Sequence, residues 1–405
     1  MPLPVRNIRP RVATFEHAFD PANNAFGFLR LALALLVIVS HSFHLGGFGA
    51  DPVEQLTDGR QTIGLLSVSL FFVLSGFLIF RSASRTPSVG KFLFHRFLRI
   101  FPGYWVCLIV CACVFAPIFA YAEHGTFLSI FAASRDSAQS YVSGNWGLFH
   151  PSGRNFVQVV GIHPQTIAGL LHRNPQPLLI NGSIWTLSFE TTCYAAVALL
   201  ALVGALRLRL VVLGLFVGLW ALSTFNFVDP IRYEHWFPVV GLEMLITLSM
   251  FFFAGGACFL YRDFIRSSKA VFATCVALSA VSLYLGWFAL VGPICLSYAF
   301  LRLGFHLPFG RLDQHGDFSY GAYIYAFPIQ QGLALLRVQD GGFGLYLTWS
   351  LLLTAIAAIL SYRFVEEPCL RWKKLKFSRG GLIATDENLL QAVHRRDLDR
   401  IGGTT

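Results

Sequence analysis

Residues 26–47 form an apolar segment that carries two ionisable side chains, Arg30 and His41. The segment is long enough to cross a bilayer as a helix, which takes roughly 20 residues. A charged side chain inside such a helix is costly unless it is paired or faces a polar cavity. This helix therefore needs neighbours that offer it partners, which restricts the chain to a multi-helix membrane protein.

Eleven residues separate Arg30 from His41, which corresponds to about 16 Å of rise and about three helical turns. The two side chains therefore lie on broadly the same face at different depths. An imidazole can accept a proton near neutral pH, since its ordinary pKa is about 6.5. We interpret His41 as the chemical centre and Arg30 as a charge on the path towards it. The alternative is an arginine that extends to the lipid headgroups and a histidine that hydrogen-bonds a neighbouring helix.

The composition agrees with a membrane protein of many spans. Hydrophobic residues make up 55% of the 405 residues and charged residues only 13%, whereas soluble domains carry about 25% charged residues. The mean hydropathy is +0.60. The net charge of +10 does not require a nucleic-acid partner, because the basic residues gather on alternate connections. The eight cysteines show neither a disulfide framework nor metal-ligand spacing, so we expect no metal.

Hydropathy and charge predict an all-α polytopic membrane protein with about ten transmembrane helices. An even number of spans places every basic cluster, and with them both termini, in the cytoplasm. The segment 270–301 has the least distinct span pattern, and we expect it to hold two short spans divided near Gly292-Pro293. The predicted spans are 26–46, 62–80, 102–122, 183–205, 210–227, 237–260, two within 270–301, 318–336 and 343–364.

Three domains follow from these spans. Residues 1–25 form a cytoplasmic tail, residues 26–370 the transmembrane domain and residues 371–405 a second cytoplasmic tail. The longest hydrophilic stretch, 123–182, is expected outside the membrane, and a structureless loop of this length is usually functional.

Two motifs lie in the second span and in the basic cytoplasmic stretch that follows it. Ser75-Gly76 in the second span allows another backbone to approach closely, which is also what simple helix packing would need. Arg96 and Arg99 lie three residues apart, so on a helix they form a fork suited to phosphate groups. The alternative is ordinary enrichment of cytoplasmic arginines. Pro102 is expected to stop or kink this helix.

Two carboxylates lie at the ends of later spans. Glu190, in a segment that begins at Trp185, is expected at the depth of His41, where a carboxylate would orient the imidazole and stabilise its charged form. Trp185 can also belong to the interfacial aromatic belt. Glu366 is expected to pair with an arginine such as Arg96 or Arg99, and Pro368 to end the last helix.

Taken in order, these segments resemble the membrane-bound acyltransferase 3 family. The resemblance covers 26–370 and is carried by six pieces that are each weak alone. They are Arg30 with His41, Phe71-Phe72-x-Leu-Ser75-Gly76-Phe77, Arg96-x-x-Arg99 with Pro102 and Tyr104, Trp185-Thr-Leu-x-x-Glu190, Ser319-Tyr320-x-x-Tyr323, and Tyr362-x-x-x-Glu366-x-Pro368.

The resemblance implies a ten-span enzyme that moves an acyl group, often acetyl, from cytoplasmic acyl-CoA to a carbohydrate or glycolipid acceptor. We therefore expect a multi-pass protein of the bacterial inner membrane that acts as an O-acyltransferase. The implied catalytic residues are His41, Glu190 and Arg30. The residues expected to bind acyl-CoA are Arg96, Arg99, Ser75 and Tyr104, and those expected to bind the acceptor are Trp185, Ser188 and His44.

Some features leave the mechanism open. Many family members have an acidic residue where Ser69 stands and a histidine where Ala326 stands, so neither contribution is expected here. His41 can act as a general base or carry the acyl group as an acyl-imidazole. The alternative function is a transporter or flippase in which Arg30, His41 and Glu190 form a relay, although no inverted repeat is visible. A scaffold protein is disfavoured, because ionisable residues recur in several spans.

Overall fold

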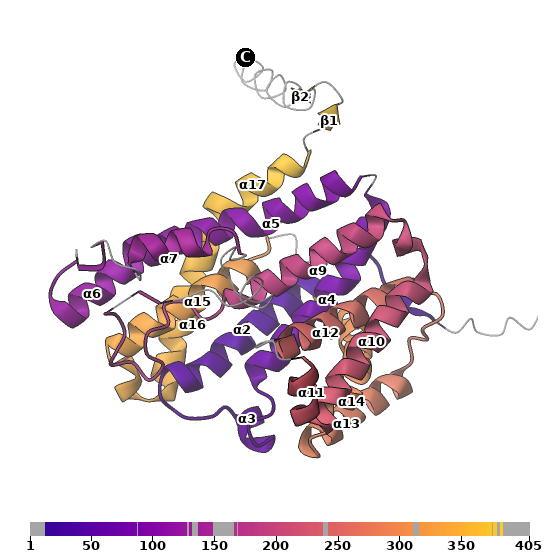
Figure 1. Cartoon of the computed structure of the whole chain (residues 1–405), viewed down its shortest axis with the longest axis horizontal. Coiled ribbons are helices and arrows are strands. Elements are labelled where there is room, and N and C mark those ends of the chain that lie inside the picture. The colour runs from indigo at the N-terminus through magenta and orange to yellow at the C-terminus, as the bar shows by residue number, and fades with distance from the viewer. Residues whose placement is uncertain are drawn as a thin grey trace, which may run out of the picture.

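The computed structural model describes residues 13–86, 88–127, 129–131, 137–148, 166–167, 169–237, 242–310, 316–374, 376–378 and 381–383. Most of the described residues are helical (Figure 1). The long helices are α2 (Phe26–Leu45), α4 (Ile63–Arg85), α5 (Val89–Val110), α9 (Trp185–Leu202), α10 (Arg209–Val228), α12 (Leu242–Leu260), α13 (Lys269–Tyr284), α14 (Phe288–His306), α15 (Ser319–Leu335) and α16 (Phe343–Ser361). The short α-helices are α1 (Phe15–Ala18), α3 (Pro52–Leu56), α6 (Ala116–His124), α7 (Ala138–Asn145), α11 (Pro230–Trp236) and α17 (Glu367–Arg371). The π-helical turns are η1 (Cys111–Phe115) and η6 (Tyr362–Glu366), and the 3₁₀ turns are η2 (Ser129–Phe131), η3 (Ala205–Arg207), η5 (Val338–Gly341) and η7 (Trp372–Lys374). The strands β1 (Lys376–Ser378) and β2 (Gly381–Ile383) form a hairpin.

The predicted fold class is confirmed, because the chain is an all-α polytopic membrane protein. Eight helical segments among the described residues are long and apolar enough to cross a membrane. The helices α13 and α15, with 16 and 17 residues, are slightly shorter. The side of the membrane on which each terminus lies stays a prediction.

The predicted boundary between the two spans within 270–301 is wrong. The chain breaks at Gly286, between α13 and α14, and Gly292-Pro293 lies inside α14. Gly286 has φ of +77°, a left-handed conformation that glycine adopts without the steric cost of a Cβ. Periodicity alone gave no reason to choose this glycine over the Gly-Pro pair.

Of the two prolines predicted to affect helix ends, Pro102 does not stop its helix and Pro368 does not end the last helical segment. Helix α5 runs through Pro102 and continues through η1 into α6, so 89–124 forms one long helical segment. Pro368 likewise falls in the first turn of α17, which follows the π-helical turn η6 without a break. Proline is tolerated at both places, since neighbouring helices and local changes of helix type satisfy the freed carbonyl groups in membrane proteins.

Helix α4 lies at the centre of the assembly, packed against α12 and α2 and touching α9 and α14 (Figure 1). Its contact with α12 brings the two backbones together. A Cβ added at Gly76 would lie 1.9 Å from the carbonyl oxygen of Phe252, and one at Gly255 would lie 2.0 Å from that of Val73. The close approach predicted for Ser75-Gly76 is confirmed.

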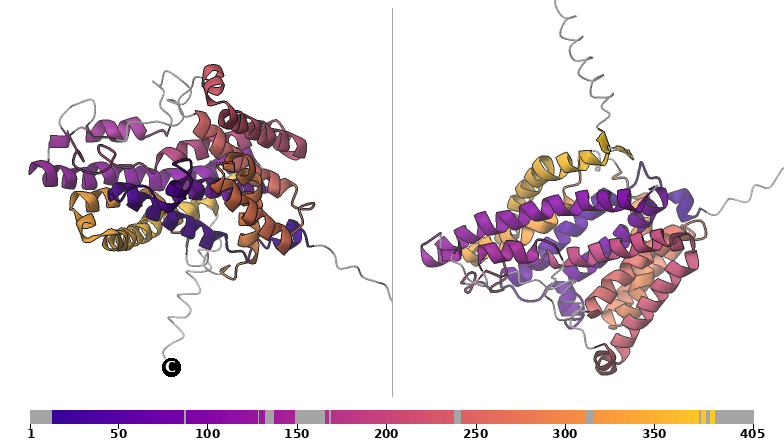
Figure 2. Two further views of the ribbon diagram at one scale, coloured as in Figure 1. Left: turned by 90° about the horizontal axis from the view of Figure 1, so that it is seen from below. Right: turned by 45° about the horizontal axis from the view of Figure 1, so that its top comes forward.

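The remaining helices lie on two sides of α2 and α4. Helices α10 to α14 gather on one side, and α5 to α7 lie with α15 to α17 on the other (Figure 2). Helix α2 contacts α4 on one face and both α15 and α16 on another. The turns of α2 that carry Arg30 and His41 therefore face several helices, as their polarity requires.

The described part of 123–182 is not structureless. Helix α7 packs beside α5, where the Tyr104 hydroxyl donates to the carbonyl of Asn145 at 2.6 Å. The rings of Trp105 and Trp146 stack with centroids 4.7 Å apart. Much of this stretch, including 149–165, lies outside the described residues, so its predicted role with the acceptor stays a prediction.

The segment before α2 is docked against the helices rather than detached from them. The Phe15 side chain in α1 has no exposed surface. Its ring contacts those of Tyr298 and Phe305 on α14. The backbone also bonds to Ile265 and Arg262 in the connection after α12.

Candidate active site

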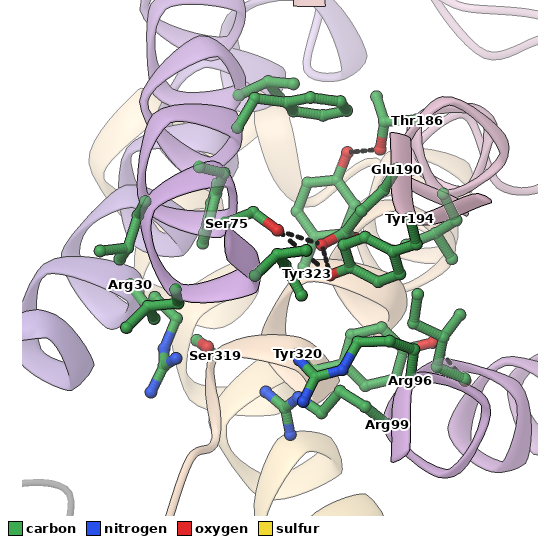
Figure 3. A pocket seen from close by; sticks show the side chains of 18 residues that line it. Arg30, Ser75, Arg96, Arg99, Thr186, Glu190, Tyr194, Ser319, Tyr320 and Tyr323 are labelled. Carbon is green, nitrogen blue, oxygen red and sulfur yellow. Dashed lines mark hydrogen bonds between the residues drawn. The ribbon is translucent and has the colours of Figure 1, made fainter. Parts of the chain in front are cut away.

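A cavity of about 150 Å³ lies between α2, α4, α5, α9 and α15. At one end the guanidinium groups of Arg30, Arg96 and Arg99 come together (Figure 3). Further in, Ser75 and Glu190 are joined by a hydrogen bond in the cavity wall. The cavity is therefore cationic at its mouth and hydrogen-bonding deeper inside. Its remaining polar lining residues are Thr186, Tyr194, Ser319, Tyr320 and Tyr323.

Two of the three arginines share one carboxylate. Asp317, just before α15, accepts a contact from Arg99 at 2.5 Å and one from Arg30 at 3.2 Å. Arg99 also contacts Glu366 at 3.3 Å, which confirms the pairing predicted for Glu366. Burial alone would raise the pKa of Asp317, but the two guanidiniums and Ser319 outweigh it and hold the pKa well below its ordinary value. Arg99 is therefore already neutralised by protein groups.

Arg96 has a different environment from Arg99. It lies within electrostatic range of Tyr194 and Glu190, but it forms no ion pair with any residue that the structure describes. Its Nε is buried and has no hydrogen-bond partner among those residues. A buried donor without an acceptor is costly, so this guanidinium is suited to an anionic ligand.

Lys373, on η7 after the last helix, adds a further cation near Arg96. Burial, followed by the charges of Arg96 and Arg99, lowers the pKa of Lys373 to about 7. The His95 side chain of α5 hydrogen-bonds the backbone of Lys373, and η7 packs on α5. No sequence motif predicted this residue, because a lysine that follows a last span reads as an ordinary cytoplasmic flank.

Glu190 does not occupy the predicted place beside His41. Its carboxylate accepts a hydrogen bond from Ser75 Oγ at 3.0 Å and another from the Tyr194 hydroxyl. The prediction rested on depth alone, and a side chain at the right depth can still face another helix. Here Glu190 faces α4 and the arginine end of the cavity. Ser75 lines the same cavity, and its contact with the acyl donor stays a prediction.

His41 does not line this cavity: it lies eleven residues, about three turns, beyond Arg30, through which α2 contributes to the lining. Its side chain is partly exposed, and the edge of its ring meets Phe327 with centroids 5.3 Å apart. Nδ1 is buried without a hydrogen-bond partner in the described part of the chain. Nε2 is therefore the nitrogen that can meet a substrate.

His44, one turn after His41, is engaged by a carboxylate. Its Nε2 lies 3.0 Å from Glu54 on α3. Asp51 lies close enough to complete a three-residue group with ligand atoms within 4.8 Å of one another. Asp51 already accepts four hydrogen bonds, however, so we assign no metal to this group.

The remaining predicted site residues have other roles or stay untested. The Tyr104 hydroxyl is buried and donates to the Asn145 carbonyl, and Tyr104 does not line the cavity, so its contact with the acyl donor stays a prediction. Ser188 donates to the carbonyl of Trp185 within α9, and neither residue lines the cavity. Their contact with an acceptor stays a prediction.

Comparison with known proteins places these residues in a wider context. Residues 23–366 match the acyltransferase 3 family model, described as an acyltransferase domain. The chain is 28% identical to an O-acetyl transferase of Shigella phage Sf6, over 88% of this chain and 98% of that protein. It is 25% identical to nodulation protein 10 of Rhizobium leguminosarum bv. viciae, over 88% and 95% respectively. A segment covering 24% of each chain is 34% identical to the acyltransferase MdmB of Streptomyces mycarofaciens. No solved structure matches the chain.

Proposed function

Since this chain belongs to the acyltransferase 3 family and is a multi-pass membrane acyltransferase, we propose that it transfers an acyl group, foremost acetyl, from cytoplasmic acyl-CoA to a hydroxyl group. The acceptor is a carbohydrate or glycolipid, and the membrane is the inner membrane of a bacterium. The observation that supports the proposal best is the cavity with three arginines at one end and Ser75 and Glu190 deeper inside, lined at Arg30 by the helix that also bears His41.

The cationic mouth supports a donor site for acyl-CoA. A CoA molecule carries phosphate groups, and Arg96 offers a buried, unpartnered donor at the mouth. Lys373 supplies a second cation beside it. Arg30 and Arg99 hold Asp317 at the edge of the same cavity. The thioester end of the donor would then extend inward past Ser75 towards His41.

His41 supports the transfer step. In the general-base route Nε2 takes the proton from the acceptor hydroxyl while the oxygen attacks the thioester carbonyl, and the thiolate leaves and is protonated. In the acyl-enzyme route Nε2 attacks the thioester carbonyl first, and the CoA thiolate leaves and is protonated. The acceptor oxygen then attacks the acyl-imidazole carbonyl, the ester forms, and the hydroxyl proton passes to the released imidazole. Since Nδ1 has no carboxylate partner in the described structure, the protein does not fix the imidazolium through an Asp or Glu of its own.

The test is release of free CoA from acetyl-CoA by the purified protein, with mass spectrometry of the candidate sugar or glycolipid. His41→Ala should abolish transfer while the protein still inserts and binds CoA. His17→Ala, an exposed change on α1, serves as the control and should retain turnover. Turnover retained by His41→Ala would refute the catalytic role, and a wild-type protein that consumes no acyl-CoA with any such acceptor would refute the proposed function.

A further inference from the structure

Gln330 of α15 bonds directly to the turn of α2 that carries His41. Its side chain has no exposed surface. Its Nε2 donates to the carbonyl oxygen of Ile38 at 2.9 Å and to Ser42 Oγ at 2.8 Å. Ile38 and Ser42 lie on either side of His41 in the sequence, so this single amide hydrogen-bonds the turn on both sides of the imidazole.

Further contacts from α2 and from α15 support these two hydrogen bonds of Gln330. Ser42 Oγ itself donates to the Ile38 carbonyl at 2.8 Å, which links the two bonding partners of Gln330 to each other. Phe327 lies one turn before Gln330, on the same face of α15, and its ring meets the His41 ring edge-on at 82°. Helix α15 therefore contacts His41 through a ring and its flanking residues through an amide.

Helix α15 is itself held rigidly at this level. The Tyr346 hydroxyl of α16 donates to the backbone carbonyl of Gln330 at 2.8 Å. The next residue, Gln331, donates to the carbonyls of Gln176 and Leu179 and accepts a bond from Asn174. Because α15 is fixed at this level, the hydrogen bonds from Gln330 restrict rotation of the α2 turn.

Packing alone does not require an amide at this position. Gln330 Oε1 is buried and has no hydrogen-bond partner in the described part of the chain. An unsatisfied buried acceptor costs about 1–3 kcal/mol. An apolar side chain of the same length would avoid that cost, so the two bonds to α2 need a further reason to be there.

We propose that Gln330 is a positioning residue for His41: its amide fixes the 38–42 turn of α2 so that the imidazole keeps its contact with Phe327 and presents Nε2 to the acceptor hydroxyl. This inference rests on the proposed role of His41. Displacing a reacting group by about 1 Å can cost on the order of 100-fold in rate. Loss of the amide should therefore slow the chemical step without affecting the distant donor site.

The experiment compares Gln330→Met with Gln331→Met in the full-length protein in detergent or nanodiscs. Both changes remove a buried amide of the same size from the same helix, so both should cost similar stability. We expect Gln330→Met to lower kcat by about 10- to 100-fold with the KM for acetyl-CoA within about twofold. Gln331→Met should change kcat by less than about threefold, since its partners lie in the 174–179 segment. Equal kcat values in the two variants would overturn the inference.

Two further variants keep the test decisive if Gln330→Met does not fold. Gln330→Leu removes both donors and the unpaired oxygen and adds no group that can bond to Ile38 or Ser42, and it should also lower kcat. Ser42→Ala removes one acceptor, and its effect on kcat should be less than additive with that of Gln330→Leu. Full additivity would contradict a shared hold on the turn. Activity retained by His41→Ala would refute the proposed role of His41, whereas activity lost in His41→Ala but kept in Gln330→Leu would refute only this inference.

Discussion

Replacing Arg99 by glutamine should destabilise the folded protein, whereas the same change at Arg96 should impair only donor binding. Arg99 contacts Asp317 at 2.5 Å and Glu366 at 3.3 Å, and the Glu366 side chain is only 2% exposed. Removing one partner of a buried ion pair leaves the other charge uncompensated, which costs about 3–5 kcal/mol. Asp317 keeps Arg30 as a second partner at 3.2 Å, so we expect the lower end, about 3 kcal/mol.

The assay combines thermal unfolding in detergent with titration of CoA. Since the unfolding entropy is about 2.1 cal/mol/K per residue, about 1 kcal/mol shifts the midpoint of a 405-residue chain by roughly 1 °C, and Arg99→Gln should lower the midpoint by about 3–4 °C. Arg96→Gln should leave the midpoint within about 2 °C and weaken CoA binding by at least tenfold, because a hydrogen bond to a charged group contributes about 1.5–3 kcal/mol.

A double variant separates charge compensation from mere loss of packing. Glu366→Gln removes the carboxylate that Arg99→Gln leaves unpaired, so the double variant should recover much of the lost stability. A stable Arg99→Gln protein that loses CoA affinity as completely as Arg96→Gln would refute the reasoning, since it would make Arg99 a ligand of the donor and not a structural cation.

Two further predictions follow from the structure. Lys373 has a pKa of about 7, so phosphate binding must protonate it above that pH, and wild-type CoA affinity should fall by up to about tenfold per pH unit between pH 7 and 8.5. Calorimetric titration of Lys373→Arg should show a flat profile there, and an equally flat wild-type profile would contradict the assignment. Gly76→Ala should lower the unfolding midpoint, because its Cβ would lie 1.9 Å from the Phe252 carbonyl and overpacking typically costs about 1–3 kcal/mol. Gly90→Ala on α5, where a Cβ meets nothing within 4 Å, should not, and equal midpoints would show that α4 and α12 separate without cost.

The sequence predicted the fold and the arginine end of the site for physical reasons that needed no coordinates. Apolar length defines membrane spans, and the cost of a charge in lipid marks Arg30. A carboxylate near the inner arginines predicted the pairing of Glu366, which the structure shows with Arg99. The sequence also predicted close helix packing at Gly76, because glycine has no Cβ to hold the neighbouring backbone away.

The parts that the sequence did not predict depend on rotation and on loops. Depth placed Glu190 near His41, but the direction in which α9 faces depends on its contacts with α4, which periodicity does not show. Asp317 lies in a connection, where a carboxylate before a helix reads as a cap and not as a partner of Arg30. Gln330 was overlooked because an uncharged amide carries no charge penalty to mark it.

The pairing of α2 with α15 extends from the arginine end of the cavity to His41. Near Arg30, α2 faces the start of α15 through Asp317, and near His41 it faces Phe327 and Gln330 further along the same helix. The two helices therefore run in the same direction, which agrees with their predicted places as the first and ninth of ten spans. Arg30 lines the cavity and His41 does not, so the two ends of this pair have different surroundings. Under the proposed function, a change at the Arg30 end should alter KM for the acyl donor, and a change at the His41 end should alter kcat.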